Sequence, residues 1–228
     1  MRILDEGGPA SDDVVLQHVA VPDDRPRDRA FTRLNMISSA DGGSTVAGVS
    51  GGLGNRGDHA VFGALRAVAD AVVVGMSTVV AEQYGPTPET GPDLYVVSGT
   101  PDITGDRRLF ESGRATIVLP HGADAPPGDV PVLRAGHGPY VDLAGLMGAL
   151  AGRVVLCEGG PSLAGAMVSE GLIDEFFLTL APRVVAGGSG RVVHGNNADP
   201  APWELHHGFV DDEGFLFLRY CRRAAATA

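Results

Sequence analysis

The residue pattern that points most clearly to chemistry is a strand that ends in an acid and two glycines, followed at once by a helix. It reads Arg153-Val-Val-Leu-Cys-Glu-Gly-Gly-Pro-Ser-Leu-Ala164, with Pro161 at the first helical position. Gly159 and Gly160 would let a pyrophosphate approach the backbone, and the free N–H groups of the helix start would attract its charge. The pattern predicts a phosphate seat, although such corners also occur only to turn the chain sharply.

A second strand-to-helix corner lies at Val74 to Glu82 and carries hydroxyl groups. Ser77 and Thr78 suit the role of helix N-caps, and capping alone would explain them. They could also donate to a ligand, because ligands of open α/β sheets bind at the carboxyl ends of the strands. Two corners of this kind raise the prospect that one dinucleotide spans both.

Two acids are candidates for proton transfer. Asp41 stands in the glycine-marked turn that follows the expected strand Asn35-Met-Ile-Ser-Ser, and Glu158 ends the strand before the two glycines. Asp before Gly is common turn chemistry, and Glu158 could be a solvated strand end. At a cofactor cleft, either carboxylate could instead fix a polar heterocycle or relay a proton.

Apolar runs without polar alternation must position these corners. Such runs predict strands covered on both faces, as in a mainly parallel sheet. They are Ala71–Gly75, Leu94–Ser98, Ala115–Leu119, Val154–Cys157 and Phe176–Leu180.

Helical patterns separate these strands. Asp58 and Asp142 are expected as N-caps of two helices, and a third helix is expected from Pro161 to Glu170. Trp203–Val210 and Phe215–Tyr220 flank a turn and predict a C-terminal antiparallel hairpin. The expected fold class is therefore α/β, with a mixed, mainly parallel sheet flanked by helices.

The chain divides unevenly. Residues 1–29 carry mixed charges and scattered prolines, which predicts an N-terminal arm with one short strand at Val14 to Val21. Residues 30–228 contain the apolar pattern and are expected to form a single domain, because no long polar linker divides them.

Composition excludes several functions. The net charge of −11 argues against nucleic-acid and membrane-surface partners, which require a basic field. All 17 basic residues are arginine, so a Schiff-base lysine and a P-loop lysine are excluded. We expect no metal, because no CxxC or HExxH pattern occurs, and we expect a cytoplasmic location, because no membrane span or signal peptide is evident.

An ordered set of segments resembles one known family. The segments are Ser38-Ser-Ala-Asp-Gly42, Leu65-Arg66, Val74-Gly-Met-Ser-Thr78 with Glu82, Glu158-Gly-Gly-Pro-Ser-Leu163, and Gly171-Leu-Ile-Asp-Glu-Phe-Phe177 followed by Ala181-Pro182. In order and spacing they resemble the reductase family of the RibD C-terminal domain, which is related in fold to dihydrofolate reductase. The resemblance implies NADPH as cofactor and a homodimer. It also implies reduction of the ribosyl group of 5-amino-6-(5-phosphoribosylamino)uracil to ribityl, a step of the riboflavin pathway.

The resemblance also implies roles for individual residues. Positions that contact NADPH in the family match Ser38, Thr78, Glu82 and the run from Gly160 to Ala166, which includes Pro161, Ser162 and Leu163. Positions that face substrate match Arg66 and Glu158, and Asp41 matches an acid near the active cleft. The deaminase half of the family's two-domain members has no counterpart here, so a free-standing reductase is expected.

One departure bears on the substrate. Family members carry a leucine-threonine-valine-arginine motif whose arginine helps to hold the ribose phosphate, and this chain has Gln83-Tyr-Gly-Pro-Thr-Pro88 instead. Either Arg56 or Arg183 takes the phosphate, or the substrate lacks one. Two alternatives stay open: reduction of another pterin-like substrate such as dihydrofolate, and a non-catalytic NADPH-binding module.

Overall fold

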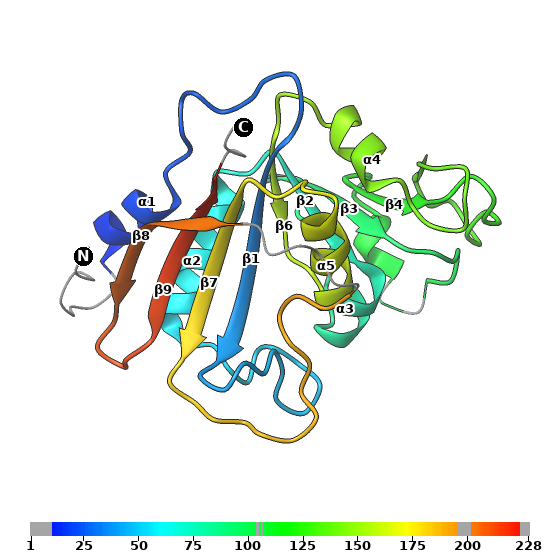
Figure 1. Ribbon diagram of the computed structural model, residues 1–228. Helices are drawn as coiled ribbons and strands as arrows, with labels where there is room; N and C mark the ends of the chain where they lie inside the picture. Colours follow the sequence, from blue (N-terminus) through cyan, green and yellow to red (C-terminus); the bar gives the residue numbers. More distant parts are fainter. Residues whose placement is uncertain (1–10, 104, 106, 196–201, 224–228) are drawn as a thin grey trace.

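The computed structural model describes residues 11–103, 105, 107–195 and 202–223. Its centre is a nine-stranded sheet in the order β5-β4-β3-β2-β6-β1-β7-β9-β8 (Figure 1). The strands are β1 (Phe31–Ser39), β2 (Ala71–Gly75), β3 (Asp93–Val97), β4 (Ala115–Leu119), β5 (Val132–Arg134), β6 (Val154–Cys157), β7 (Glu175–Ala181), β8 (Trp203–Val210) and β9 (Leu216–Arg222). The helices are α1 (Asp12–Val19), α2 (Arg56–Ala67), α3 (Met76–Ala81), α4 (Leu143–Ala149) and α5 (Pro161–Ser169), with a 3-10 turn at Arg107–Phe110.

Strand direction confirms the mixed sheet predicted from the sequence. Strands β1 to β7 pair in parallel, with β6 between β2 and β1. Strand β9 runs antiparallel to β7 and forms the C-terminal hairpin with β8. Every residue of β2 and β6 is buried, as expected of central strands covered on both faces. This order brings the carboxyl ends of β1, β2 and β6 together, where the glycine corner begins.

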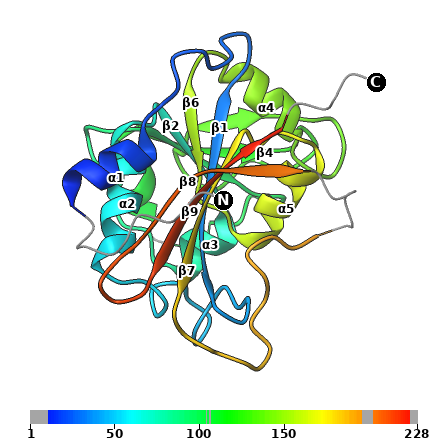
Figure 2. The same ribbon diagram turned by 60° about the vertical axis from the view of Figure 1, so that its left-hand side comes forward.

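Helices cover both faces of the sheet (Figures 1 and 2). Residues of α1, α2 and α3 pack with Val72 and Val74 in one apolar cluster. Residues of α4 and α5 pack with Ala71 and Val73 in another cluster on the opposite face. The alternation along β2 shows how a continuous apolar run supplies two cores at once. No helix within the described ranges is long and apolar enough to cross a membrane.

The N-terminal arm contains a helix, so the strand predicted at Val14 to Val21 is wrong. Ser11 is the N-cap, and Asp12 and Asp13 lie in the first turn, where they favour the positive end of the helix dipole. Val15, His18 and Val19 are buried, which is the spacing of one helix face. Figures 1 and 2 place α1 beside α2 at the hairpin side of the sheet.

Two capping predictions were also wrong. Asn55 caps α2 through a 3.0 Å bond from the Asp58 N–H to its side-chain oxygen, so Asp58 lies inside the first turn. The helix α3 begins after Gly75 without a side-chain cap, which leaves Ser77 and Thr78 inside it. The predicted Asp142 cap of α4 and the Pro161 start of α5 are confirmed. The residues that are not caps, Asp58, Ser77 and Thr78, all line the cavity described below.

A buried group of charges joins the arm to the sheet. Glu175 on β7 lies between Arg33 on β1 and Arg219 on β9, and all three side chains are almost fully buried. Arg33 Nε lies 2.8 Å from Glu175 Oε2, and Arg219 also pairs with this carboxylate. Burial lowers the pKa of the Arg33 guanidinium to about 10, against the opposing effect of Glu175. The remaining guanidinium N–H groups donate to backbone carbonyls of His18, Val19 and Ala20.

Candidate functional site

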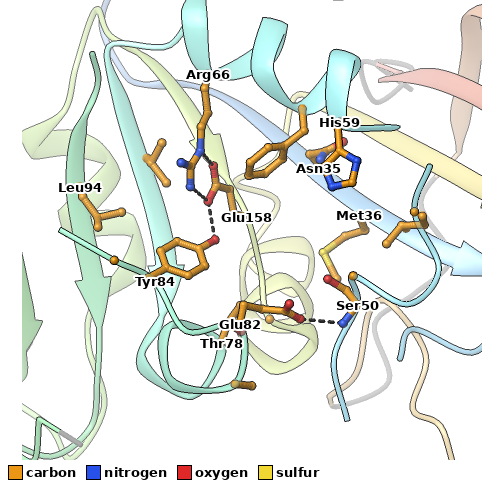
Figure 3. Close-up of a pocket in the computed structure, with 18 of the residues that line it drawn as sticks. Asn35, Met36, Ser50, His59, Arg66, Thr78, Glu82, Tyr84, Leu94 and Glu158 are labelled. Atoms are coloured by element: carbon orange, nitrogen blue, oxygen red, sulfur yellow. Dashed lines mark hydrogen bonds and ion pairs between the residues drawn. The ribbon is translucent and has the colours of Figure 1, made fainter. Parts of the chain in front are cut away.

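A cavity of about 760 Å³ opens beside the carboxyl ends of β1, β2 and β6. Its walls come from β1, the loop of residues 44–54, α2, α3, the loop of residues 84–92 and the glycine corner that follows β6. Figure 3 shows Asn35, Met36 and His59 on one side, with Tyr84 and Leu94 across from them. This volume falls within the range of small-molecule binding sites.

Glu158 is the centre of a polar cluster in this cavity (Figure 3). Its Oε1 lies 2.6 Å from Arg66 Nε, and its Oε2 lies 2.7 Å from Arg66 Nη2 and 2.6 Å from the Tyr84 hydroxyl. The Glu158 side chain is buried, whereas 37% of the Arg66 side chain is exposed. Burial, and then the nearby carboxylate, raise the pKa of Tyr84 above its ordinary value, so its hydroxyl remains a donor.

Arg66 is held from two further directions. Its guanidinium carbon lies 4.6 Å from the centre of the Phe62 ring and 5.6 Å from that of Tyr84. These cation–π contacts, together with the bidentate ion pair to Glu158, fix the plane of the guanidinium. Arg66, Tyr84 and Glu158 come from α2, the loop after α3 and the end of β6, so only the folded sheet joins them.

The glycine corner, which directly follows Glu158, forms another part of the cavity wall. Gly160, Pro161, Ser77 and Thr78 line it, and α5 begins at Pro161. A Cβ added to Gly160 would lie 2.5 Å from Thr78 Oγ1, so the two corners predicted from the sequence touch each other. Gly159 has φ of +76°, a conformation that favours glycine. The start of α5 and the close backbone surface fit a dinucleotide pyrophosphate.

Glu82 closes the cavity from the side of α3. Its Oε1 accepts a 2.7 Å bond from the backbone N–H of Ser50, and both residues line the cavity (Figure 3). This bond ties the loop of residues 44–54 to α3. The carboxylate therefore shapes the cavity mouth and has a second oxygen available to a ligand.

Asp41 lies outside this cavity lining. It is exposed and accepts bonds from the Ser39 hydroxyl at 2.6 Å and from the backbone N–H groups of Ala186 and Val185 at 2.8 and 3.1 Å. These bonds, the Ser39 bond first, lower its pKa to about 2. Asp41 is thus an anchor between two loops in this structure, and it is ionised near neutral pH.

Several other residues predicted from the sequence also do not line the cavity. Ser38 is buried, and its hydroxyl donates to the Ser39 carbonyl. Ser162 is exposed on α5, and Leu163 packs into the apolar core. Arg56 is exposed at the start of α2, and Arg183 donates to the Gly52 carbonyl from an exposed position. The structure therefore gathers Thr78, Glu82, Gly160, Pro161, Arg66 and Glu158 in one cavity and leaves these others outside it.

The comparisons with known proteins decide the family. Residues 30–217 match the RibD C-terminal domain. The chain belongs to this family. A 2,5-diamino-6-ribosylamino-4(3H)-pyrimidinone 5′-phosphate reductase of Methanothermobacter thermautotrophicus is 29% identical over 189 residues, which cover 75% of this chain and 87% of the relative.

Solved structures agree with the RibD C-terminal domain on the fold. A pyrimidine reductase-like protein of Corynebacterium diphtheriae has a TM-score of 0.77 at 22% identity, with 96% of this chain and 100% of that chain covered. The dihydrofolate reductase of Enterococcus faecalis, complexed with NADP(H), has a TM-score of 0.55 at 14% identity, with 85% and 97% covered. The predicted dihydrofolate reductase-like architecture is confirmed.

Sequence reasoning missed two side chains of this RibD-type cavity. Tyr84 lies in the segment that differs from the family's arginine motif, and its type and position in the sequence do not indicate a role in the site. Asp58 was interpreted as a helix cap, yet it lines the cavity. Asn55 is an equally good N-cap three residues earlier, and its presence leaves the Asp58 side chain free for another role.

The charge of the cavity is mainly negative. Among the described residues that line it, the carboxylates are Asp58, Glu82 and Glu158, and the arginine is Arg66. Because Arg66 is already paired with Glu158, the lining offers a phosphate group little cationic help. Within the described ranges, no three His, Cys, Asp or Glu side chains gather in a way that could hold a metal ion.

Proposed function

We propose that this chain is an NADPH-dependent reductase of the riboflavin pathway. The reaction is reduction of the ribosyl group of a 6-ribosylaminopyrimidine to ribityl. The candidate substrates are 5-amino-6-(5-phosphoribosylamino)uracil, which the resemblance implies, and its 2,5-diaminopyrimidinone counterpart. The observation that carries the proposal is one cavity whose lining contains both the Arg66–Glu158–Tyr84 cluster and the glycine corner at the start of α5. Family membership and the named reductase of M. thermautotrophicus support the same reaction class.

Bound at the glycine corner, NADPH supplies a hydride to C1 of the opened, imine-like ribosyl group. The adjacent nitrogen would take one proton, so that the imine would become an amine with the two electrons of the hydride. The N–H groups at the start of α5 would hold the pyrophosphate, and Thr78 and Glu82 line the same cavity. The protein's contribution is orientation, exclusion of water and a proton route.

The proton route is assigned to the polar cluster. Tyr84 is a donor at 2.6 Å from Glu158, and Arg66 keeps the carboxylate in place. Glu158 orients the substrate, and the Tyr84 hydroxyl and Glu158 together can pass a proton from solvent. In this proposal Asp41 does not transfer a proton. It fixes the positions of two loops, because its oxygens accept hydrogen bonds from Ser39, Val185 and Ala186.

The proposal includes the cofactor NADPH, a homodimer and a cytoplasmic location. The choice of NADPH is supported by the E. faecalis dihydrofolate reductase, whose structure contains NADP(H). The homodimer and the cytoplasmic location stay predictions from the sequence. A pterin-like substrate is the second candidate, because the fold is that of dihydrofolate reductase and the cavity offers a phosphate little cationic help.

The direct test mixes purified protein with NADPH and either 5-amino-6-(5-phosphoribosylamino)uracil, its 2,5-diaminopyrimidinone counterpart or dihydrofolate. Loss of nicotinamide absorbance with either ribosylaminopyrimidine is the expected result. Oxidation with dihydrofolate alone would assign the pterin function. Tight NADPH binding without oxidation of any substrate would indicate a binding module.

Replacing Gly160 with valine is expected to weaken NADPH binding at least about tenfold. The new side chain would start 2.5 Å from Thr78 Oγ1 and would fill the surface proposed for the pyrophosphate. A branched side chain there would also block a ligand from reaching the backbone N–H groups at the start of α5. Calorimetric titration with NADPH gives the dissociation constant. The matched control is Gly148→Val on α4, where an added Cβ meets nothing within 4 Å. An unchanged dissociation constant for Gly160→Val would remove the phosphate seat.

A further inference from the structure

Asp58 is a carboxyl group in the cavity wall that the proposed reaction has not used. It lies in the first turn of α2, and its side chain does not cap the helix, since Asn55 does so. The hydroxyl of Thr179 on β7, a residue that is almost fully buried, lies near enough to stabilise the ionised form of Asp58. Burial raises the pKa of Asp58, while the Thr179 hydroxyl and His59 act in the opposite direction. The group is therefore held at a cost, which a ligand with matching donors would offset.

A close approach between α2 and the sheet determines the position of this carboxyl group. A Cβ added to Gly57 would lie 2.8 Å from Phe217 Cζ, so the first turn of α2 approaches β9 more closely than a larger residue would allow. Asn55 also donates to Asp211 at 2.7 Å, which fixes the start of the helix against the hairpin. These contacts fix the first turn of α2, and with it Asp58, in the cavity wall beside the sheet.

The surroundings of Asp58 define what it can bind. Met36, Ile37 and Phe62 line the same cavity and are apolar, so a flat heterocycle can lie against them. A carboxylate that accepts one hydroxyl bond keeps acceptor positions on both oxygens. The partner that fits it is a pair of parallel N–H donors, as offered by a ring N–H next to an exocyclic amino group. Arg66, the arginine of the described lining, is bound to Glu158 and is therefore not paired with Asp58.

The two candidate pyrimidines differ at this edge. A 2-amino-4-oxo ring presents a ring N–H and an amino group side by side, and pterins present the same edge. A uracil ring presents a carbonyl oxygen in place of that amino group, and a carboxylate facing it would meet an acceptor. The named substrate of the M. thermautotrophicus relative is a 2,5-diaminopyrimidinone.

We propose that Asp58 determines specificity by binding the 2-amino and ring N–H groups of a 2-aminopyrimidinone substrate. The inference rests on the proposed function, because it assumes that this cavity holds the reacting pyrimidine. The preferred substrate is then the 2,5-diamino-6-ribosylaminopyrimidinone 5′-phosphate, and the uracil analogue is disfavoured. Charged hydrogen bonds of this kind carry enough energy for discrimination of about tenfold or more.

The test compares kcat/KM for the two ribosylaminopyrimidine phosphates with NADPH. Wild-type protein is expected to prefer the 2-amino substrate by at least about tenfold. Asp58→Asn is expected to abolish or reverse this ratio, because an amide offers one donor and one acceptor and so matches the uracil edge. The ratio separates specificity from a loss of folding, which would lower both values together. Asp212→Asn in the exposed hairpin turn is the matched control and is expected to keep the wild-type ratio.

The outcomes separate the two proposals. A wild-type preference for uracil, or an Asp58→Asn variant with an unchanged ratio, would overturn the role of Asp58 and leave the reductase function intact. Failure to oxidise NADPH with either pyrimidine would overturn the proposed function itself. A wild-type preference for the 2-amino substrate that the Asn variant loses would establish the inference.

Discussion

A Glu158→Gln variant is expected to lose at least about a hundredfold in kcat/KM and to bind NADPH within about threefold of wild type. Glu158 accepts two bonds from Arg66 and one from Tyr84, all between 2.6 and 2.7 Å. An amide in its place can accept at one position only and presents an N–H group to donors. Charged hydrogen bonds contribute about 1.5–3 kcal/mol each, so loss of more than one accounts for the expected factor.

Tyr84→Phe is the graded control for this experiment. It removes one bond to Glu158 and leaves the Arg66 pair in place, so a smaller decrease of about tenfold is expected. Steady-state kinetics with the preferred pyrimidine give both values, and fluorescence titration gives the NADPH dissociation constant. Wild-type kcat/KM in the Glu158→Gln variant would remove the cluster from the reaction.

The second large effect concerns stability. Glu175→Gln is expected to lower the free energy of unfolding by about 3–5 kcal/mol, because the change leaves Arg33 and Arg219 buried without their counter-charge. Arg33, Arg219 and Glu175 are 1%, 4% and 2% exposed, respectively, so water cannot replace the carboxylate. Urea unfolding followed by circular dichroism measures the difference.

The chain offers a matched exposed pair as the control. Glu204 and Arg223 lie 3.8 Å apart with side chains more than half exposed. Glu204→Gln is expected to change stability by less than about 1 kcal/mol, because solvent screens such pairs. Equal effects of the two substitutions would mean that Glu175 does not neutralise the buried arginines.

The sequence predicted the sheet well because its signals were local. The unbroken apolar runs of β2 and β6 are what strands covered on both faces require, and Pro161 marks the start of α5. The arm was predicted less well. Val14 and Val15 suggest a strand by their side-chain type, but Ser11 and the buried spacing of Val15 and Val19 favour a helix.

The site was predictable where one segment carries it and was missed where distant segments meet. Gly160 and Thr78 each stood out in a single corner of the chain. The contact between Arg66 and Glu158 spans 92 positions, and only a family resemblance suggested that both face one ligand. Tyr84 and Asp58 had no local signature. Their roles come from burial and from partners on α2, β6 and β7, which a single sequence does not disclose.

The arm has a consequence for where the folded unit starts. The family match begins at residue 30, yet carbonyls of His18, Val19 and Ala20 accept bonds from Arg33 and Arg219. A chain cut at residue 30 would lose these acceptors and expose the apolar cluster that Val15 and Val19 complete. The limits of the family match and of the packed structure therefore differ here, because the packed structure includes the helix that Ser11 caps.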